Sequence, residues 1–179
     1  MKIYTIRHGY TNMNKKHLYN GQIDEDINEE GIKGAEEARE QLKDMKFDVI
    51  YCSPMIRTKH TCEIINVNDI PVIFDNRLKE RTLGILDGKS LKEEGLTKKE
   101  FYDYFYKTNI ENFEELPTLF ERVHSLIDEI KQKKYDKVLI VAHGGVLSAI
   151  HYYFNEIPKD GDLSSFKQAN CEVLEYEIK

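Results

Sequence analysis

Two apolar runs of the chain end in a histidine followed by a glycine, and these endings carry the residues best suited to chemistry. Residues 2–6 lead into Arg7 and His8, and residues 137–142 lead into His143. In open α/β sheets, ligands bind in the crevice outside the carboxyl ends of the strands. A cation with two imidazoles at such ends predicts an anion site in which a histidine can act as a nucleophile.

A third apolar run supplies a second guanidinium. Residues 47–52 have the composition of a buried strand, and Arg57 falls in the first turn of the helix expected after them. An arginine offers a planar fork that matches the oxygens of a phosphoryl group, for which a lysine is a poor substitute. Arg7 and Arg57 at one sheet edge therefore favour phosphate chemistry.

Strand-like and helix-like segments alternate along the whole chain. Asn28 is a good N-cap with two glutamates in the turn after it, and it predicts a helix to about residue 43. Further helices are expected around Arg57 to residue 65, at 118–133 and after residue 145, and further strands at 72–74 and 171–176. Such alternation predicts a doubly wound α/β sandwich with a mostly parallel central sheet and helices on both faces.

Length and composition fit a single domain, residues 1–179, with a short insert at about residues 88–117. The chain has 179 residues, of which 40% are hydrophobic and 32% are charged. The insert is charged and rich in tyrosine, and we expect it to form a helical lid whose aromatic side chains pack internally. The three cysteines are odd in number and lie beside apolar runs, so buried free thiols are expected.

The charge balance argues against two classes of partner. The formal net charge is −6 at pH 7, whereas nucleic acids and anionic membranes require a basic face. The chain enters a strand at once, and no apolar run is long enough to cross a bilayer, so a cytoplasmic protein is expected. A small phosphorylated metabolite stays compatible with an acidic protein, because a few arginines can focus positive potential in a pocket.

The motifs occur in an order that resembles the histidine phosphatase superfamily, in its phosphoglycerate-mutase-like phosphatase branch. The resemblance covers nearly the whole chain, and it adds the Leu-x-Glu motif that contains Glu80. It implies that His8 is the nucleophile of a phosphohistidine intermediate and that Glu80 protonates the leaving group. Arg7, Arg57 and His143 are then expected to hold the phosphoryl oxygens, so neither a metal nor a cofactor is expected.

Four further positions are expected to contact the substrate. Asn14 and Gly21 match family positions that approach the bound phosphate, and Gly144 offers a backbone amide at a helix start. Arg81 follows the catalytic glutamate as in the mutase form of the motif, and it is expected to bind a second anionic group. Position 10 departs from the family pattern, because Tyr10 stands where Glu or Gln is common, which puts one contact of the pocket wall in doubt.

The expected activity is that of a metal-independent phosphomonoesterase acting on a small phosphorylated metabolite. One alternative is a 2,3-bisphosphoglycerate-dependent phosphoglycerate mutase, but the insert lacks the paired arginines that mutases use on the distal group. Two others are a catalytically weak relative that binds a phosphorylated ligand, and a metal-dependent hydrolase with His8 and His143 as ligands. The residues leave the natural substrate and the oligomeric state open, with a homodimer among the options.

Overall fold

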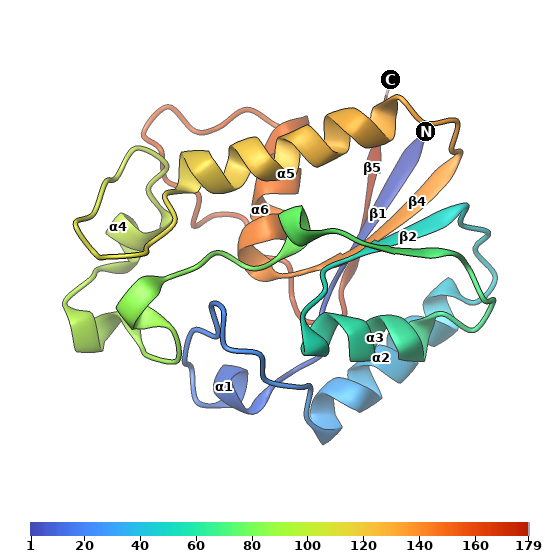
Figure 1. The fold of residues 1–179 in the computed structure, drawn as a ribbon, viewed down its shortest axis with the longest axis horizontal. Helices are drawn as coiled ribbons and strands as arrows, with labels where there is room; N and C mark the ends of the chain where they lie inside the picture. Colours follow the sequence, from blue (N-terminus) through green and yellow to red (C-terminus); the bar gives the residue numbers. More distant parts are fainter. Residues whose placement is uncertain (179) are drawn as a thin grey trace.

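The computed structural model describes residues 1–178, and its centre is a five-stranded sheet (Figure 1). The strands are β1 (Lys2–Arg7), β2 (Val49–Cys52), β3 (Val72–Phe74), β4 (Lys137–Ala142) and β5 (Val173–Glu177). Their order across the sheet is β3-β2-β4-β1-β5. All neighbouring pairs are parallel except β1 and β5, which pair antiparallel. The mostly parallel sheet expected from the sequence is confirmed.

Strand register brings three strand ends to one edge of the sheet. Arg7 of β1 lies opposite Ala142 of β4, and Cys52 of β2 lies opposite Val141 of β4. The backbone continues this ladder one step further, because the Ser53 amide donates to the Val141 carbonyl at 3.0 Å. The residues that follow β1, β2 and β4 therefore lie beside one another.

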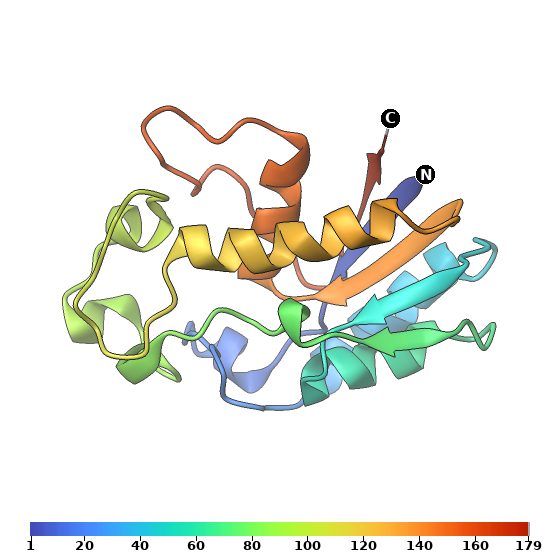
Figure 2. The ribbon, with the colours of Figure 1, turned by 45° about the horizontal axis from the view of Figure 1, so that its top comes forward.

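Four longer helices cover the two faces of the sheet (Figures 1 and 2). They are α2 (Glu29–Leu42), α3 (Ile56–Ile65), α5 (Leu116–Lys131) and α6 (Gly144–Phe154). Along β4, Val138 and Ile140 are buried together with α5 and α6. Leu139 and Val141 point to the opposite face, where they are buried with α2 and α3. Helices on both faces, as the sequence predicts, are confirmed.

The starts of two helices follow from local sequence. Asn28 caps α2, because its side-chain oxygen accepts from the Gly31 amide at 3.0 Å, as the sequence predicts. α5 begins at Leu116, two residues before the expected start. Pro117 is accommodated there because the first turn of a helix needs no hydrogen bond from its amides.

Residues 88–117, which we call the lid segment, lie beyond the carboxyl ends of the parallel strands (Figure 2). Helical structure in this segment is limited to a 3₁₀ turn at Leu91–Glu94 and the short α4 (Lys98–Tyr102). The helical lid expected from the sequence is thus mostly irregular. Capping boxes at Ser90 and Thr97 start these short helices, and a left-handed glycine ends the first of them.

The lid segment has its own small apolar cluster. Its buried members are Leu83, Leu86, Leu91, Leu96 and Phe101. The expectation that the lid aromatics pack internally holds for Phe101. It is wrong for Phe105, which is 63% exposed. Outside the lid segment, the remaining short helical pieces are α1 (Asn12–Lys15) and the 3₁₀ turns Asn76–Leu78 and Gly84–Leu86.

Two expectations drawn from composition can be compared with the fold. All three cysteines are free thiols; Cys52 and Cys62 are buried, whereas Cys171 is partly exposed, so the expectation of burial fails there. Within residues 1–178, no helix combines the length and the apolar character needed to span a membrane.

Candidate active site

His8 lies directly after β1, and a backbone carbonyl fixes its imidazole. Its Nδ1 is 2.8 Å from the carbonyl oxygen of Gly9. A carbonyl only accepts, so Nδ1 carries the hydrogen and Nε2 keeps its lone pair. His8 is only 3% exposed, and its ring centroid lies 5.2 Å from that of His143.

The backbone around His8 is held from two sides. An ideal Cβ on Gly9 would lie 2.7 Å from the carbonyl oxygen of Gly31, so a larger residue does not fit where this loop crosses α2. On the other side, the Asn170 side-chain amide donates to the His8 carbonyl at 2.8 Å. The position of the imidazole is therefore set by contacts with both the first and the last parts of the chain.

Arg7 has one nitrogen that is not satisfied by the protein. Its Nη1 donates to the Gln168 carbonyl at 3.1 Å, and its own carbonyl accepts from the Cys171 amide at 2.9 Å. Its Nε is buried, and it has no hydrogen-bond partner among the described residues. Leaving a buried donor unpaired costs about 1–3 kcal/mol, so Nε is a donor available to a bound anion.

Arg57 is fully buried, and its guanidinium group donates hydrogen bonds to three acceptors. Nη1 donates to the Ile23 carbonyl at 2.8 Å, and Nη2 donates to the Gly21 carbonyl at 3.0 Å. Nε donates to Nδ1 of His143 at 3.2 Å. A guanidinium has five N–H groups, so one hydrogen on Nη1 and one on Nη2 remain for an anion.

His143 is buried after β4, and both of its ring nitrogens have protein partners. Nδ1 accepts from Arg57, and Nε2 lies 2.7 Å from the hydroxyl oxygen of Ser53. An arginine N–H can only donate, so Nδ1 is bare and the neutral ring carries its hydrogen on Nε2. His143 therefore donates to Ser53 in this arrangement.

The two imidazoles are neutral at pH 7. Burial lowers the pKa of His8 well below 6.5, and the charges of Arg57 and Arg7 lower it further. Burial likewise lowers the pKa of His143 well below 6.5, with further contributions from Arg57, His8, Arg7 and Arg122. A neutral nucleophile beside two fixed cations suits attack on a phosphomonoester dianion.

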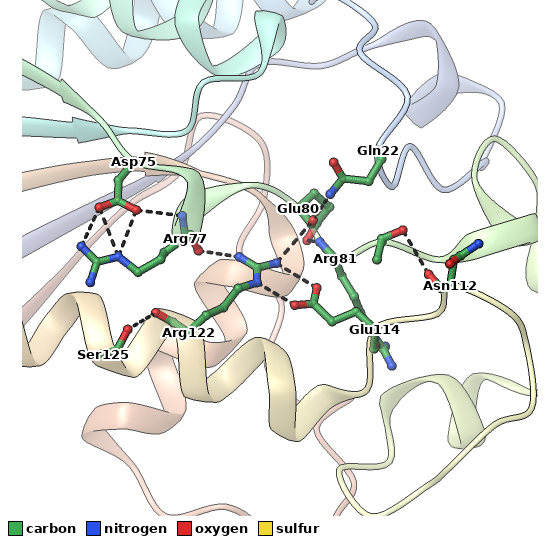
Figure 3. Close-up of polar contacts among 10 residues, drawn as sticks. Gln22, Asp75, Arg77, Glu80, Arg81, Asn112, Glu114, Arg122 and Ser125 are labelled. Carbon is green, nitrogen blue, oxygen red and sulfur yellow. Dashed lines mark hydrogen bonds and ion pairs between the residues drawn. The ribbon is translucent and has the colours of Figure 1, made fainter.

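Glu80 is fixed by contacts of its backbone and of its carboxyl group, and Figure 3 shows the side chains of Gln22 and Arg122 that reach its backbone carbonyl. Its Oε1 accepts from the Arg81 amide at 2.8 Å, and its Oε2 accepts from the Gly145 amide at 3.3 Å. Its backbone carbonyl accepts from the side chains of Arg122 and Gln22. Both the backbone and the carboxyl group of Glu80 are thus held in place.

Arg81 bonds to the lid segment. Its Nε donates to the Glu114 carbonyl at 2.6 Å, and its Nη1 donates to the Phe101 carbonyl at 3.0 Å. Its Cζ lies 4.4 Å from the ring centroid of Phe113 and 5.1 Å from that of Phe101. These contacts give Arg81 a part in holding the lid segment, and its expected role as a substrate ligand stays a prediction.

The three other residues expected to contact the substrate lie beside the arginines of the site or in a loop next to it. They are Gly21, Gly144 and Asn14. Gly21 has a φ of 49°, which favours glycine, and it presents its carbonyl to Arg57. An ideal Cβ on Gly144 would lie 3.5 Å from Cζ of Arg7, so the start of α6 packs against that guanidinium. Asn14 donates to the Asn20 side-chain oxygen at 3.2 Å and helps to order the loop before Gly21.

Sequence reasoning missed four residues that position the site. Gln22 and Ser53 contact Glu80 and His143, and Gln168 and Asn170 hold the end of β1. Ser53 could have been found, because it follows an apolar run just as His143 does. The other three lie in irregular segments where no pattern marks them.

No metal-binding cluster is found in the part of the chain that the structure describes. Residues 1–178 contain no group of three or more His, Cys, Asp or Glu side chains that could hold a metal ion. The charges that act on His8 come from the guanidinium groups of Arg57 and Arg7. The expected independence from metals stays a prediction for solution measurements.

Comparison with known proteins agrees with this geometry. The sequence profile described as "histidine phosphatase superfamily (branch 1)" matches residues 3–179. The chain belongs to the histidine phosphatase superfamily. The phosphatase branch expected from the motifs is supported by its relatives, which are named as phosphatases or as phosphoglycerate-mutase-like.

Two sequence relatives and two solved structures illustrate the similarity of this histidine phosphatase to known proteins. It is 36% identical to the uncharacterized phosphatase PhoE of Bacillus subtilis over 97% of this chain and 86% of that protein. It is 32% identical to a metal-independent phosphoserine phosphatase of Arabidopsis thaliana over 90% and 72%. The structure of Bacillus stearothermophilus YhfR matches with a TM-score of 0.88 and 26% identity over 99% and 91%. The α-ribazole phosphatase of Shigella flexneri shares the fold, with a TM-score of 0.85 and 24% identity over 100% and 91%.

Proposed function

We propose that this histidine phosphatase is a metal-independent phosphomonoesterase that works through a phosphohistidine at His8. The observation that carries the proposal is the hydrogen bond from Nδ1 of His8 to Gly9, which leaves the Nε2 lone pair for attack on phosphorus. The unpartnered Nε of Arg7 and the two remaining N–H groups of Arg57 supply donors for the phosphoryl oxygens. These donors stabilise the charge that spreads over the equatorial oxygens in the transition state.

In the first half of the reaction, Nε2 of His8 forms a bond to phosphorus while the bond from phosphorus to the leaving oxygen breaks. The carboxyl group of Glu80 gives its proton to that oxygen. In the second half, the Glu80 carboxylate takes a proton from water, and the water oxygen attacks phosphorus as the bond to Nε2 breaks. Phosphate leaves, and His8 and Glu80 return to their starting states.

A small phosphorylated metabolite is the proposed class of substrate. Relatives named as phosphoserine phosphatases support this class. A mutase needs cations at the far end of its pocket to retain and reorient a bisphosphate, but the two arginines beside Glu80 are already engaged. Arg81 bonds to lid carbonyls, and Arg122 makes a bidentate pair with Glu114 at 2.6 and 2.9 Å. We therefore propose that water, and not a second acceptor hydroxyl, receives the phosphoryl group.

Trapping the intermediate tests the proposal. Wild-type protein denatured during turnover of a labelled phosphomonoester should carry acid-labile phosphate. His8→Ala should carry none, should turn over at least about 10³-fold more slowly, and should keep the wild-type circular dichroism spectrum. Label on another residue would contradict the role of His8.

Three companion measurements separate the alternatives. Turnover of p-nitrophenyl phosphate distinguishes an enzyme from a binding module, and activity that is lost in chelator would indicate a metal-dependent hydrolase. Free phosphate should appear stoichiometrically, with little dependence on added 2,3-bisphosphoglycerate. Interconversion of 3- and 2-phosphoglycerate that outpaces phosphate release would identify a mutase instead.

We extend the proposal to a cytoplasmic location, which rests on the absence of a long apolar run in the sequence. Cell fractionation tests it. The homodimer stays a prediction, and sedimentation velocity of the purified chain would decide it.

A further inference from the structure

We propose that Ser53 is a positioning residue for His143, and that binding of a phosphoryl dianion causes His143 to take up one proton at Nδ1. The inference rests on the proposed function, because it concerns the same anion site. It adds a residue outside the motif histidines and arginines, and it links substrate binding to a proton on His143.

Ser53 is rigidly placed. It is fully buried directly after β2, its amide donates to the Val141 carbonyl at 3.0 Å, and its carbonyl accepts from the Thr58 hydroxyl at 2.9 Å. With its backbone engaged on both sides, its hydroxyl stays 2.7 Å from Nε2 of His143. This contact fixes which edge of the imidazole points inward, so Nδ1 is the atom on the side of Arg57.

In this arrangement neither ring nitrogen of His143 has a hydrogen to offer an anion. Its Nε2 hydrogen is used on Ser53, and its Nδ1 accepts from Nε of Arg57. A phosphoryl oxygen held by Arg57 would meet the bare lone pair of Nδ1, and two acceptors in contact repel each other. His143 can obtain the Nδ1 hydrogen as a new proton, or it can move its Nε2 hydrogen to Nδ1 while the Ser53 hydroxyl, which can also donate, turns towards Nε2. The charges around the ring decide between these two routes.

The surrounding charges explain why the proton arrives with the anion. His143 is faced by Arg57 from α3, by Arg7 and His8 at the end of β1, and by Arg122 from α5. Glu80 lies at the start of α6 through its bond to Gly145. Without an anion to offset them, the arginines and burial keep the imidazole neutral. A dianion offsets two positive charges, and the imidazolium then becomes the favoured form.

The step balances as a simple proton transfer. A buffer acid in the solvent loses one proton, and Nδ1 of His143 gains it. Nε of Arg57 then donates to the anion, Nδ1 donates to a second phosphoryl oxygen, and the Nε2 hydrogen stays on Ser53. Loss of the product phosphate returns the proton to solvent.

Sulfate is a suitable probe because it stays a dianion near neutral pH, so any proton taken up must go to the protein. Calorimetric titration of the whole chain with sulfate, in buffers of different ionisation enthalpy, should give close to one proton taken up per sulfate. In protein with ¹⁵N-labelled imidazoles, the Nδ1 resonance of His143 should move from the bare to the protonated range. Sulfate binding without proton uptake would overturn the proton transfer, whether Nδ1 stays bare or gains its hydrogen by a shift of tautomer.

Substitution of the serine tests its positioning role. In Ser53→Ala the imidazole is free to turn, so its Nε2 hydrogen can serve the anion without an extra proton. Proton uptake should fall towards zero, and sulfate affinity should fall about 10- to 100-fold, as expected for a lost hydrogen bond to a charged group. Ser165→Ala is the control, because it removes a hydroxyl whose partner is Tyr152 and not Ser53 or His143, and it should keep the wild-type uptake.

The outcomes separate this inference from the proposed function. Wild-type uptake and affinity in Ser53→Ala would overturn the role of Ser53. If Ser53→Ala does not fold, judged by circular dichroism, the proton count and the ¹⁵N resonances of the wild type still decide the proton transfer. No binding of sulfate would overturn the anion site itself. Proton-linked sulfate binding in a protein that fails to hydrolyse phosphomonoesters would support the inference and contradict the proposed phosphatase activity.

Discussion

Gly145 and Glu80 are in a contact that leaves no room for a side chain. The Gly145 amide donates to Oε2 of Glu80 at 3.3 Å, and an ideal Cβ on Gly145 would lie 2.6 Å from Oε1. The glycine therefore both binds the carboxyl group and makes space for it. Sequence alone shows a glycine after His143-Gly144, but it does not show that the carboxyl group of Glu80 occupies the space beside it.

Gly145→Ala should displace Glu80 and slow the release of poor leaving groups. A misplacement of about 1 Å at a catalytic group costs on the order of 10²-fold, so we expect an alkyl phosphate to react about 10- to 100-fold more slowly. Stability should stay level or rise slightly, because alanine favours a helix over glycine. Ser125→Ala on the exposed side of α5 is the control, with a gain in helix propensity and unchanged turnover, because the Ser125 hydroxyl bonds only to the Arg122 carbonyl. Full activity of Gly145→Ala would contradict the expected displacement.

Glu80→Gln should separate leaving groups by their need for a proton. In single-turnover experiments, release of an alkyl alcohol should slow by about 10²–10³-fold, because a general acid typically contributes 10²–10⁴-fold. Release of p-nitrophenol should slow much less, since its phenolate is a stable leaving group. Equal slowing of both would remove Glu80 as the acid of the first half-reaction.

Arg81→Met should destabilise the protein more than it changes substrate choice. The substitution leaves the Glu114 and Phe101 carbonyls without a buried donor, and burial already lowers the pKa of Arg81 to about 10. Loss of such a buried network typically costs about 2–4 kcal/mol, which corresponds to a fall in Tm of roughly 5–15 °C for a chain of this size.

Two comparisons complete the Arg81 test. Lys107→Met, which removes an exposed lid cation, should leave Tm nearly unchanged. The ratio of kcat/KM between substrates with charged and uncharged leaving groups should be the same in Arg81→Met as in the wild type. A selective loss on charged leaving groups with little change in Tm would instead make Arg81 a substrate ligand.

Stability should fall as the pH drops below about 6.5. Burial and the nearby arginines hold the pKa values of His8 and His143 well below 6.5, whereas in the unfolded chain both titrate near that value. Below about pH 6.5, the unfolded state therefore binds more protons than the folded state. The contribution of these two histidines to the free energy of unfolding is fully present above about pH 6.5. It is lost on acidification, by up to about 1.4 kcal/mol per pH unit for each histidine.

Urea unfolding at pH 7.5, 6.5 and 5.5 measures this slope. The double variant His8→Gln with His143→Gln should be distinctly less sensitive to pH over this range, because neither site can then titrate. An unchanged slope in the double variant would assign the pH dependence to other groups.

The fold and the principal site residues could be predicted because their signals are local. Apolar runs that end in histidine fix both the strand and the side chain at its end, and the parallel register then brings those ends together. The start of α2 could be predicted for the same reason, since Asn28 and the glutamates after it act within one turn of the helix.

The features that the sequence did not predict depend on contacts between segments that are far apart in the chain. The partners of Arg81 are lid carbonyls, and a backbone carbonyl leaves no mark in a sequence. Gln168 and Asn170 contact β1 across some 160 positions, from a segment without periodicity. Phe105 was expected to pack because aromatic residues usually do, but its position at an irregular turn leaves it in solvent.

Asn170 donates a hydrogen bond to the backbone of His8, and Cys171 donates one to the backbone of Arg7. These bonds also determine when the site can form during synthesis. A ribosome makes the strand that bears the nucleophile 162 residues before Asn170. At about 5–20 residues per second, roughly 10–30 s pass between these two events. A nascent chain thus exposes Arg7 and His8 long before it can arrange them for catalysis, and phosphatase activity should begin only after residues 170 and 171 have been made and have folded onto the sheet.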